Sequence, residues 1–148
     1  MLLRRSILLS TSLTLSLWAC HSAVERSEGE PSADTTARTA SYTDIDVAQF
    51  NDMMRSKDFL LVNVHIPYEG EIPGTDLNIP FDEIDQALDQ LGGVGSKIVL
   101  YCRSDRMSRI ASARLAELGY TDVYNVVGGM RAWSEAGHEL EQRRAGGS

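Results

Sequence analysis

The chain has few cysteines and few basic residues, and each shortage excludes a class of protein. Only two cysteines, Cys20 and Cys102, occur among 148 residues, without a C-x-x-C pair, and the three histidines are scattered. A structural zinc site needs about four such ligands close together, so we expect no metal site. Lys and Arg number 14 against 21 Asp and Glu, giving a formal net charge of −7. This charge argues against nucleic-acid binding, which needs clustered positive charge to neutralise phosphates.

A long apolar run is also missing, although a shorter one lies near the start of the chain. Arg4 and Arg5 precede a mainly apolar segment over residues 7–19, interrupted only by Ser and Thr. This segment is shorter than the ~20 residues that a membrane-spanning helix requires. Basic residues followed by a short apolar run are typical of an export signal, so residues 1–19 are predicted to be a signal peptide.

The end of this segment, Leu17-Trp18-Ala19-Cys20, resembles a bacterial lipobox. The resemblance implies that Cys20 becomes the lipidated first residue of the mature protein, which would lie on the periplasmic side of a bacterial membrane. Ordinary cleavage near Ala19 or Ala23 and an uncleaved signal anchor are the alternatives. If Cys20 carries lipid, Cys102 is the only free thiol left, and a lone exported thiol is a candidate for a reactive site.

The composition divides the remaining chain into three parts. Residues 20–41 are rich in Ser, Thr, Ala and acidic residues and lack apolar periodicity, so they are predicted to be a flexible tether. Residues 141–148 are polar and end in Gly-Gly-Ser, which predicts a disordered tail. No internal repeat is found, so one folded unit is expected over residues 42–140.

Within that unit, apolar runs of strand length alternate with helical patterns. Asp46 and Gln49 have the spacing of an N-capping box and predict the start of a helix. Such alternation is typical of a parallel sheet with helices on both faces, which places the chain in the α/β class. Strands are predicted at 59–65, 97–101 and 122–127, and further helices at 81–91, 107–118 and 130–136.

Cys102 directly follows the second of these buried strands and begins the loop that enters the next helix. The carboxyl ends of strands are where open α/β sheets gather functional groups. A thiol at a helix N-terminus lies near unpaired backbone N–H groups and the positive end of the helix dipole. Arg103, Arg106 and Arg109 add positive charge nearby, and all these effects favour the nucleophilic thiolate. The alternative is a buried and inert cysteine that packs as a small apolar residue.

Three separated segments resemble the rhodanese family in the right order. Tyr101-Cys102-Arg103-Ser104, together with Ser108, resembles the family loop Cys-Arg-Ser-Gly-x-Arg-Ser. The segment 123–133, with Gly128-Gly129 and Trp133, resembles the closing strand and helix of the family. Upstream, segments 70–74 and 78–80 resemble its Gly-His-Ile-Pro-Gly and Asn-Ile-Pro motifs.

This resemblance implies a rhodanese-like fold over residues 42–140 and a sulfur-transfer activity. Cys102 would take sulfane sulfur from a small donor as a persulfide and pass it to a thiol or protein acceptor, without a metal or an organic cofactor. The cradle around the sulfur would be formed by Arg103, Ser104, Asp105, Arg106, Met107 and Ser108.

Two residues of the loop depart from the family pattern. Asp105 stands where the family has glycine, and Met107 stands where it has arginine. Asp tolerates a left-handed backbone better than most residues, so the loop shape is expected to survive. Its carboxylate would oppose a thiolate and an anionic donor, which argues against efficient turnover of thiosulfate. Upstream, Asn63 and His65 replace the Asp and Arg of the family, consistent with a neutral arrangement in place of an ion pair.

Two alternatives to a sulfurtransferase remain open at this stage. A phosphatase or arsenate reductase would place an arginine six residues after the cysteine, but Ser108 occupies that position and the arginine is Arg109. A non-catalytic module that binds sulfur species or a partner is the stronger alternative, and Asp105 is the feature that favours it.

Overall fold

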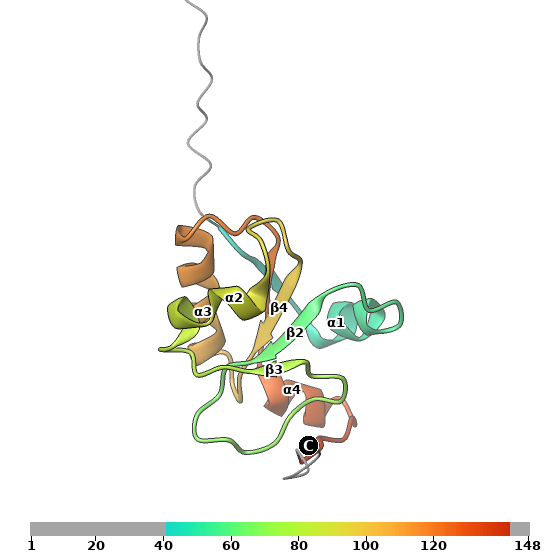
Figure 1. Ribbon diagram of the computed structural model, residues 1–148. Helices are drawn as coiled ribbons and strands as arrows, with labels where there is room; N and C mark the ends of the chain where they lie inside the picture. Colours follow the sequence, from blue (N-terminus) through green and yellow to red (C-terminus); the bar gives the residue numbers. More distant parts are fainter. Residues whose placement is uncertain (1–40, 143–148) are drawn as a thin grey trace, which may run out of the picture. The chain divides into compact units, whose positions relative to one another are not determined.

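The computed structural model describes residues 41–142, which form an α/β fold around one parallel sheet (Figure 1). The sheet has five strands in the order β1-β5-β4-β2-β3, and every pairing is parallel. The signal peptide, Cys20, nearly all of the predicted tether and most of the predicted tail lie outside the described residues. The strands are β1 (Thr43–Ile45), β2 (Leu60–Asn63), β3 (Leu77–Asn78), β4 (Ile98–Tyr101) and β5 (Val123–Val126).

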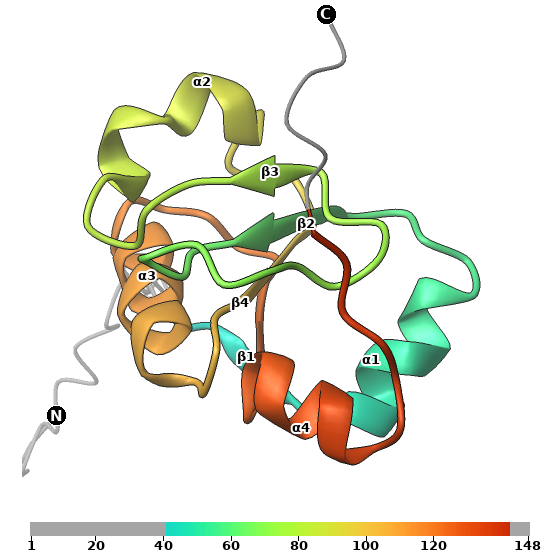
Figure 2. The same cartoon turned by 90° about the horizontal axis from the view of Figure 1, so that it is seen from below.

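Helices cover both faces of this sheet, which confirms the predicted fold class. Figure 2 shows α2 and α3 on one side of the strands and α1 and α4 on the other. Each side has its own apolar cluster, one including Leu91 and Leu115 and the other including Phe50 and Trp133. The helical elements are α1 (Val47–Met54), the 3₁₀ turn η1 (Ile84–Gln86), α2 (Leu88–Leu91), α3 (Arg106–Glu117) and α4 (Gly129–Glu135).

Strand β4 lies between β5 and β2, and all four of its residues are buried. Successive side chains of a strand point to opposite faces. Ile98 and Leu100 accordingly belong to the cluster under α3, whereas Val99 and Tyr101 belong to the cluster under α1 and α4. Cys102 continues this alternation and belongs to the cluster under α3. The position of β4 in the sheet thus fixes the face on which the thiol lies.

The predicted helix start at Asp46 is confirmed. The Asp46 carboxylate accepts a hydrogen bond from the backbone N–H of Gln49 at 2.8 Å, and the Gln49 side chain accepts one from the backbone N–H of Asp46 at 2.9 Å. This reciprocal pair satisfies two of the N–H groups that a helix start leaves free. The predicted strands and helices from 97 to 136 are also present, within two residues of their expected bounds.

Other predicted elements need correction. The helix expected over 81–91 is a 3₁₀ turn followed by one turn of α-helix, separated at Ala87. A 3₁₀ turn places residues three apart on one side, which lets both Ile84 and Ala87 reach the core. The two edge strands β1 and β3 were not predicted, because they have only three and two residues.

The expected tail boundary at residue 140 is too early. The N–H groups of Glu71 and Glu141 each donate to the other residue's carbonyl at 2.8 Å, forming an antiparallel bridge. The chain therefore remains paired with the domain at Glu141.

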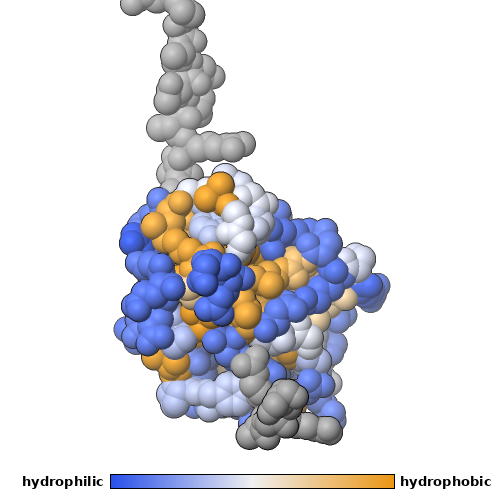
Figure 3. Space-filling model, viewed as in Figure 1, coloured by the Kyte–Doolittle hydropathy of each residue, from blue (hydrophilic) through white to orange (hydrophobic). Residues whose placement is uncertain are grey.

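On the face seen in Figure 3, apolar residues gather around α2 and are surrounded by hydrophilic ones. Within residues 41–142, none of the helices has the length and apolar character needed to cross a membrane.

Candidate active site

Cys102 lies at the carboxyl edge of the sheet, directly after β4. Its side chain is buried and takes part in no disulfide. The chain then bends over residues 103–105 and enters α3 at Arg106. The structure thus places the thiol between a buried strand and a helix start, as the sequence indicated.

Two groups of the loop reach the sulfur. The backbone N–H of Asp105 donates to Cys102 Sγ at 3.1 Å. The hydroxyl of Ser108, a fully buried residue on the first turns of α3, lies 3.5 Å from the same sulfur. That hydroxyl also lies 3.0 Å from the carbonyl oxygen of Asp105 and has one proton to donate. The backbone N–H of Asp105 is therefore the donor committed to the sulfur, and the Ser108 proton can turn toward it when negative charge develops there.

The start of helix α4 holds the loop from the other side. The N–H of Met130 donates to the carbonyl oxygen of Cys102 at 2.9 Å, and the N–H of Arg131 donates to that of Arg103 at 3.0 Å. Gly129, at φ 54°, allows this close approach, because any Cβ at this position would overlap the Cys102 carbonyl oxygen. Gly129 at the start of α4 is thus required for close packing against the cysteine loop as well as for the turn.

The electrostatics around the loop differ from the expectation that three arginines favour the thiolate. Arg103 pairs with Glu69 through two contacts, at 3.2 and 3.3 Å. Arg109 pairs with Asp44 at 3.0 Å and with the carboxylate of Asp105 at 3.5 Å. The charges of these two arginines are therefore largely compensated by carboxylates. Arg106 is exposed and has no ion pair within residues 41–142, so its charge is the one that these carboxylates leave uncompensated.

The remaining cradle residues separate into two environments. Met107 is half-buried and packs against the apolar cluster that contains Cys102, so the position of the family arginine is occupied by a core side chain. Ser104 is exposed and lines a small hollow together with Gly128 and Arg131. Met107 therefore belongs to the packing of the core on the Cys102 side of the sheet, whereas Ser104 is accessible from solvent.

Asp105 has a positive φ of 99°, and it is the one non-glycine residue with a positive φ within residues 41–142. That value lies beyond the left-handed helical region, which is centred near 57°. The backbone conformation agrees with the expected replacement of a glycine. The carboxylate is bound by two partners: Oδ1 accepts a hydrogen bond from Asn125 Nδ2 at 2.7 Å, and Oδ2 lies 3.5 Å from Arg109. These two partners compensate part of its negative charge, so the opposition to an anionic donor that the sequence suggested is weakened.

The free-energy cost of the strained Asp105 backbone and the gain from the hydrogen bond to its carboxylate are of similar size. A residue held in a sparsely populated backbone region costs about 1–3 kcal/mol. A hydrogen bond to a charged group contributes about 1.5–3 kcal/mol. The bond from the fully buried Asn125 is consequently large enough to offset the strain at Asp105.

The end of β2 and the loop after it carry Asn63 and His65, which stand where the family has Asp and Arg. Asn63 is buried; its amide donates to the carbonyl oxygen of Gly70 at 3.0 Å and accepts from the N–H of His65 at 3.0 Å. His65 Nε2 lies 3.5 Å from the carboxylate of Glu69, the same residue that pairs with Arg103. Asn63 therefore fixes the loop that brings Glu69 beside the cysteine loop.

Tyr101 fixes a later part of the same segment. Its hydroxyl accepts a hydrogen bond from the N–H of Ile72 at 2.9 Å and lies 2.6 Å from the Thr75 hydroxyl. Burial raises the pKa of the Tyr101 phenol well above its usual value, so the group is a neutral hydrogen-bonding partner.

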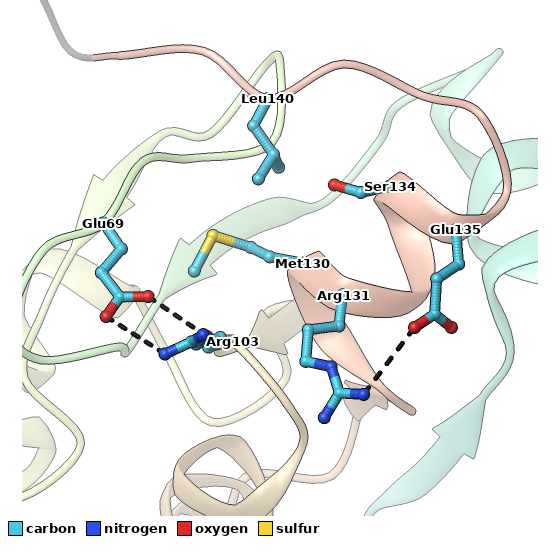
Figure 4. Close-up of a pocket in the computed structure, with 7 residues that line it drawn as sticks. All are labelled: Glu69, Arg103, Met130, Arg131, Ser134, Glu135 and Leu140. Atoms are coloured by element: carbon cyan, nitrogen blue, oxygen red, sulfur yellow. Dashed lines mark hydrogen bonds and ion pairs between the residues drawn. The ribbon is translucent and has the colours of Figure 1, made fainter.

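A pocket of about 280 Å³ lies next to the cysteine loop (Figure 4). Figure 4 shows the Glu69–Arg103 pair at one side and the Arg131–Glu135 pair at the other. Two side chains of each sign thus line a hollow that reaches the loop through Arg103. The lining residues are Glu69, Arg103, Met130, Arg131, Ser134, Glu135 and Leu140.

Comparison with known proteins agrees with this fold. The family model of the rhodanese-like domain matches residues 46–136, so the chain belongs to the rhodanese-like domain family. Thiosulfate sulfurtransferase GlpE of Pseudoalteromonas translucida is 28% identical over 109 residues, which are 69% of this chain and 98% of the relative. A sulfurtransferase of Allochromatium vinosum is 35% identical over 85 residues, 55% of this chain and 78% of the relative. A rhodanese-like domain protein of Staphylococcus aureus has a TM-score of 0.57 at 28% identity and covers 68% of this chain and 99% of its own.

The sequence did not reveal four residues that hold the loop in place. Glu69 and Asp44 neutralise arginines, Asn125 binds the Asp105 carboxylate, and Gly129 receives the Cys102 carbonyl. Asn125 had a detectable signal, because it is the polar residue inside the apolar strand 122–127. Nothing in the linear pattern links Glu69 or Asp44 to the cysteine, since they lie on other strands and loops.

Proposed function

We propose that this protein is a sulfurtransferase that carries sulfane sulfur as a persulfide on Cys102. The observation that supports this most directly is the backbone N–H of Asp105, which donates to Cys102 Sγ at 3.1 Å. A donor fixed at that place stabilises negative charge on the thiolate before the reaction, and on sulfur during it. The relatives named as sulfurtransferases support the same activity.

The reaction has two steps, each a displacement at sulfur. The Cys102 thiolate attacks the sulfane sulfur of the donor, a bond between the two sulfurs forms, and the donor's remaining group leaves with the electron pair of the broken S–S bond. An acceptor thiolate then attacks the outer sulfur, and Cys102 leaves as the thiolate. This is covalent catalysis by an activated nucleophile, and no redox partner is consumed.

The proposed donor is a neutral or protein-borne persulfide rather than thiosulfate. Arg103 and Arg109 are paired with carboxylates, which leaves Arg106 as the one arginine of the loop without an ion pair among residues 41–142 to attract a dianion. Substrate contacts are proposed for the loop residues Arg103, Ser104, Asp105, Arg106, Met107 and Ser108. Among these, the Asp105 N–H and the Ser108 hydroxyl face the sulfur.

Intact-mass analysis of the full-length protein tests the carrier step. After treatment with a low-molecular-weight persulfide donor, we expect a gain of one sulfur that peptide mapping assigns to Cys102 in wild-type protein, and no gain on the same peptide of the Cys102→Ser variant. Reduction should remove the adduct. Wild-type protein without the adduct, but with a Cys102 thiol that alkylates fully, would rule out the carrier function.

The second candidate function is a rhodanese-like module that binds a sulfur species or a partner without turnover. Cys102 favours it, because only 2% of this residue is exposed and an acceptor must reach the outer sulfur of a persulfide. A stoichiometric adduct that no thiol acceptor discharges would identify this second function. Repeated release of the sulfur would identify the enzyme.

Export and lipid anchoring at Cys20 are proposed with this function. The protein would then act on the periplasmic side of a bacterial membrane, on sulfur species of that compartment. Mass analysis of the protein isolated from its native membrane should show a lipid-sized increase on Cys20. An unmodified N-terminus at residue 20 or 24 would instead indicate ordinary cleavage.

A further inference from the structure

Four side chains beside the cysteine loop form a closed ring of polar contacts. Asn125 Nδ2 donates to Oδ1 of Asp44 and to Oδ1 of Asp105, both at 2.7 Å. Arg109 closes the ring on the opposite side, through Oδ2 of Asp44 at 3.0 Å and Oδ2 of Asp105 at 3.5 Å. One amide and one guanidinium thus bridge the same two carboxylates.

The ring ties the cysteine loop to the sheet. Asp44 lies on β1, Asn125 lies on the neighbouring strand β5, and Arg109 lies on α3. Asp44 and Asn125 are directly paired in the register of the two strands. Asn125 is fully buried, so its amide has one fixed position. Asp105 is the ring member that belongs to the cysteine loop.

The direction of the Asn125 amide is set by the two carboxylates. An amide oxygen facing two carboxylate oxygens would be repelled, so the nitrogen must face them. The Asn125 oxygen consequently remains without a hydrogen-bond partner among residues 41–142. Leaving a buried acceptor unpaired is unfavourable. A gain in stability from burying Asn125 therefore does not explain why this residue has its oxygen unpaired. The two hydrogen bonds from its amide nitrogen to carboxylates explain it.

We infer that Asn125, Arg109 and Asp44 are positioning residues for the sulfur chemistry. They hold the Asp105 side chain, and through it the backbone at φ 99°, so that the Asp105 N–H stays directed at Cys102 Sγ. Glycine reaches such a φ without help from a side chain. An Asp at this position reaches it because its carboxylate is anchored at both oxygens. The ring therefore substitutes for the loop glycine. This role rests on the proposed function of Cys102 as a nucleophile.

A double-mutant cycle separates this role from general stabilisation. If the ring acts only through Asp105, removing Asn125 should affect the thiol when residue 105 is Asp and have little effect when it is Gly. A residue that stabilises the fold in a general way would have the same effect in both backgrounds.

The readout is alkylation of Cys102 by iodoacetamide, a neutral electrophile, followed on the Cys102 peptide of the full-length protein. Asn125→Leu should slow alkylation about tenfold, since a hydrogen bond to a charged group contributes that much or more. The midpoint of its pH–rate profile should move upward, because the thiolate loses its donor. In the Asp105→Gly background, Asn125→Leu should change the rate less than twofold.

Asp44→Asn and Arg109→Gln test the ring at its more exposed members, in case Asn125→Leu does not fold. Both should slow alkylation by several fold. Arg114→Gln is the matched control, because Arg114 lies on the same helix and pairs with the surface residue Asp85 at 2.8 Å. This control should leave the alkylation rate unchanged.

Equal effects of Asn125→Leu in the wild-type and Asp105→Gly backgrounds would overturn the inference, as would equal effects of Arg109→Gln and Arg114→Gln. These outcomes are independent of sulfur transfer, since alkylation needs no sulfane donor. A wild-type protein that forms no persulfide would refute the proposed function, while the cycle would still report whether the ring positions the Asp105 N–H.

Discussion

The turns after β4 and after β5 meet the same requirement, a backbone with positive φ at the carboxyl edge of the sheet, in different ways. After β5, Gly128 and Gly129 have φ of 77° and 54°. After β4, Asp105 has φ of 99° and is held by hydrogen bonds and an ion pair. The difference is one of space: at Gly129 a Cβ would overlap the Cys102 carbonyl oxygen, whereas the Asp105 side chain has room and partners. Glycine is therefore required by close contact at the turn after β5, whereas at the turn after β4 an anchored Asp can adopt the positive φ instead.

The largest effect on stability is expected at the turn after β5, where a side chain has no space. Gly129→Ala should lower the free energy of unfolding by about 3 kcal/mol or more, because overpacking displaces the backbone of the cysteine loop. Urea unfolding measures this loss. Alkylation of Cys102 should change as well, since the N–H groups of α4 bind the Cys102 and Arg103 carbonyls. A variant with wild-type stability would show that the two turns do not differ in the way described.

A smaller loss is expected for Asp105→Ala. Alanine keeps the strained φ and loses both anchors of the carboxylate, which should lower the unfolding free energy by about 2 kcal/mol. Asp105→Gly loses the same anchors but relieves the strain, so it should be more stable than Asp105→Ala. Urea midpoints of both variants and wild type give the order. Equal stability of the two variants would mean that backbone strain at residue 105 is negligible.

A change in donor preference is expected from Asp105→Gly. Removing one negative charge beside the loop should raise the rate with thiosulfate relative to the rate with a neutral persulfide donor, by about two- to fivefold. The ratio of the two rates in one preparation is the measurement, because it cancels any general effect on the thiol. An unchanged ratio would indicate that Arg109 and Asn125 screen the carboxylate completely.

The smallest effect on stability is expected for the ion pair between Arg114 on α3 and Asp85, which holds neither of the two turns. A hydrogen bond from Arg114 lowers the pKa of Asp85, so the pair stabilises the fold above the unfolded pKa and this stabilisation is lost as the pH falls. Asp85→Asn should slightly lower the melting temperature at pH 7, and the difference from wild type should fade at an acid pH at which the Asp85 carboxyl group is protonated. Melting curves at both pH values test this. A large difference at pH 7 would show that surface pairs of α3 contribute as much as the Asp105 contacts.

Much of the fold could be predicted from local patterns. The buried run before Cys102, the helix from Arg106 and the capping box at Asp46 each depend on neighbouring residues, and all were confirmed. The short edge strands β1 and β3 could not be predicted, because two or three residues give no periodicity. The interruption at Ala87 depends on packing against the core, which apolar spacing alone does not describe.

For the site, the sequence by itself determined that a single thiol follows a buried strand and precedes a helix, since order along the chain fixes both. Only the tertiary structure decided the charge around that thiol. Glu69 neutralises Arg103 from the loop after β2, and Asp44 reaches Arg109 from β1. Asn125 binds the Asp105 carboxylate from β5. Electrostatic and hydrogen-bonding contacts act over a few ångströms in space, and parallel pairing brings strand ends together that lie 20 to 81 positions apart in the chain.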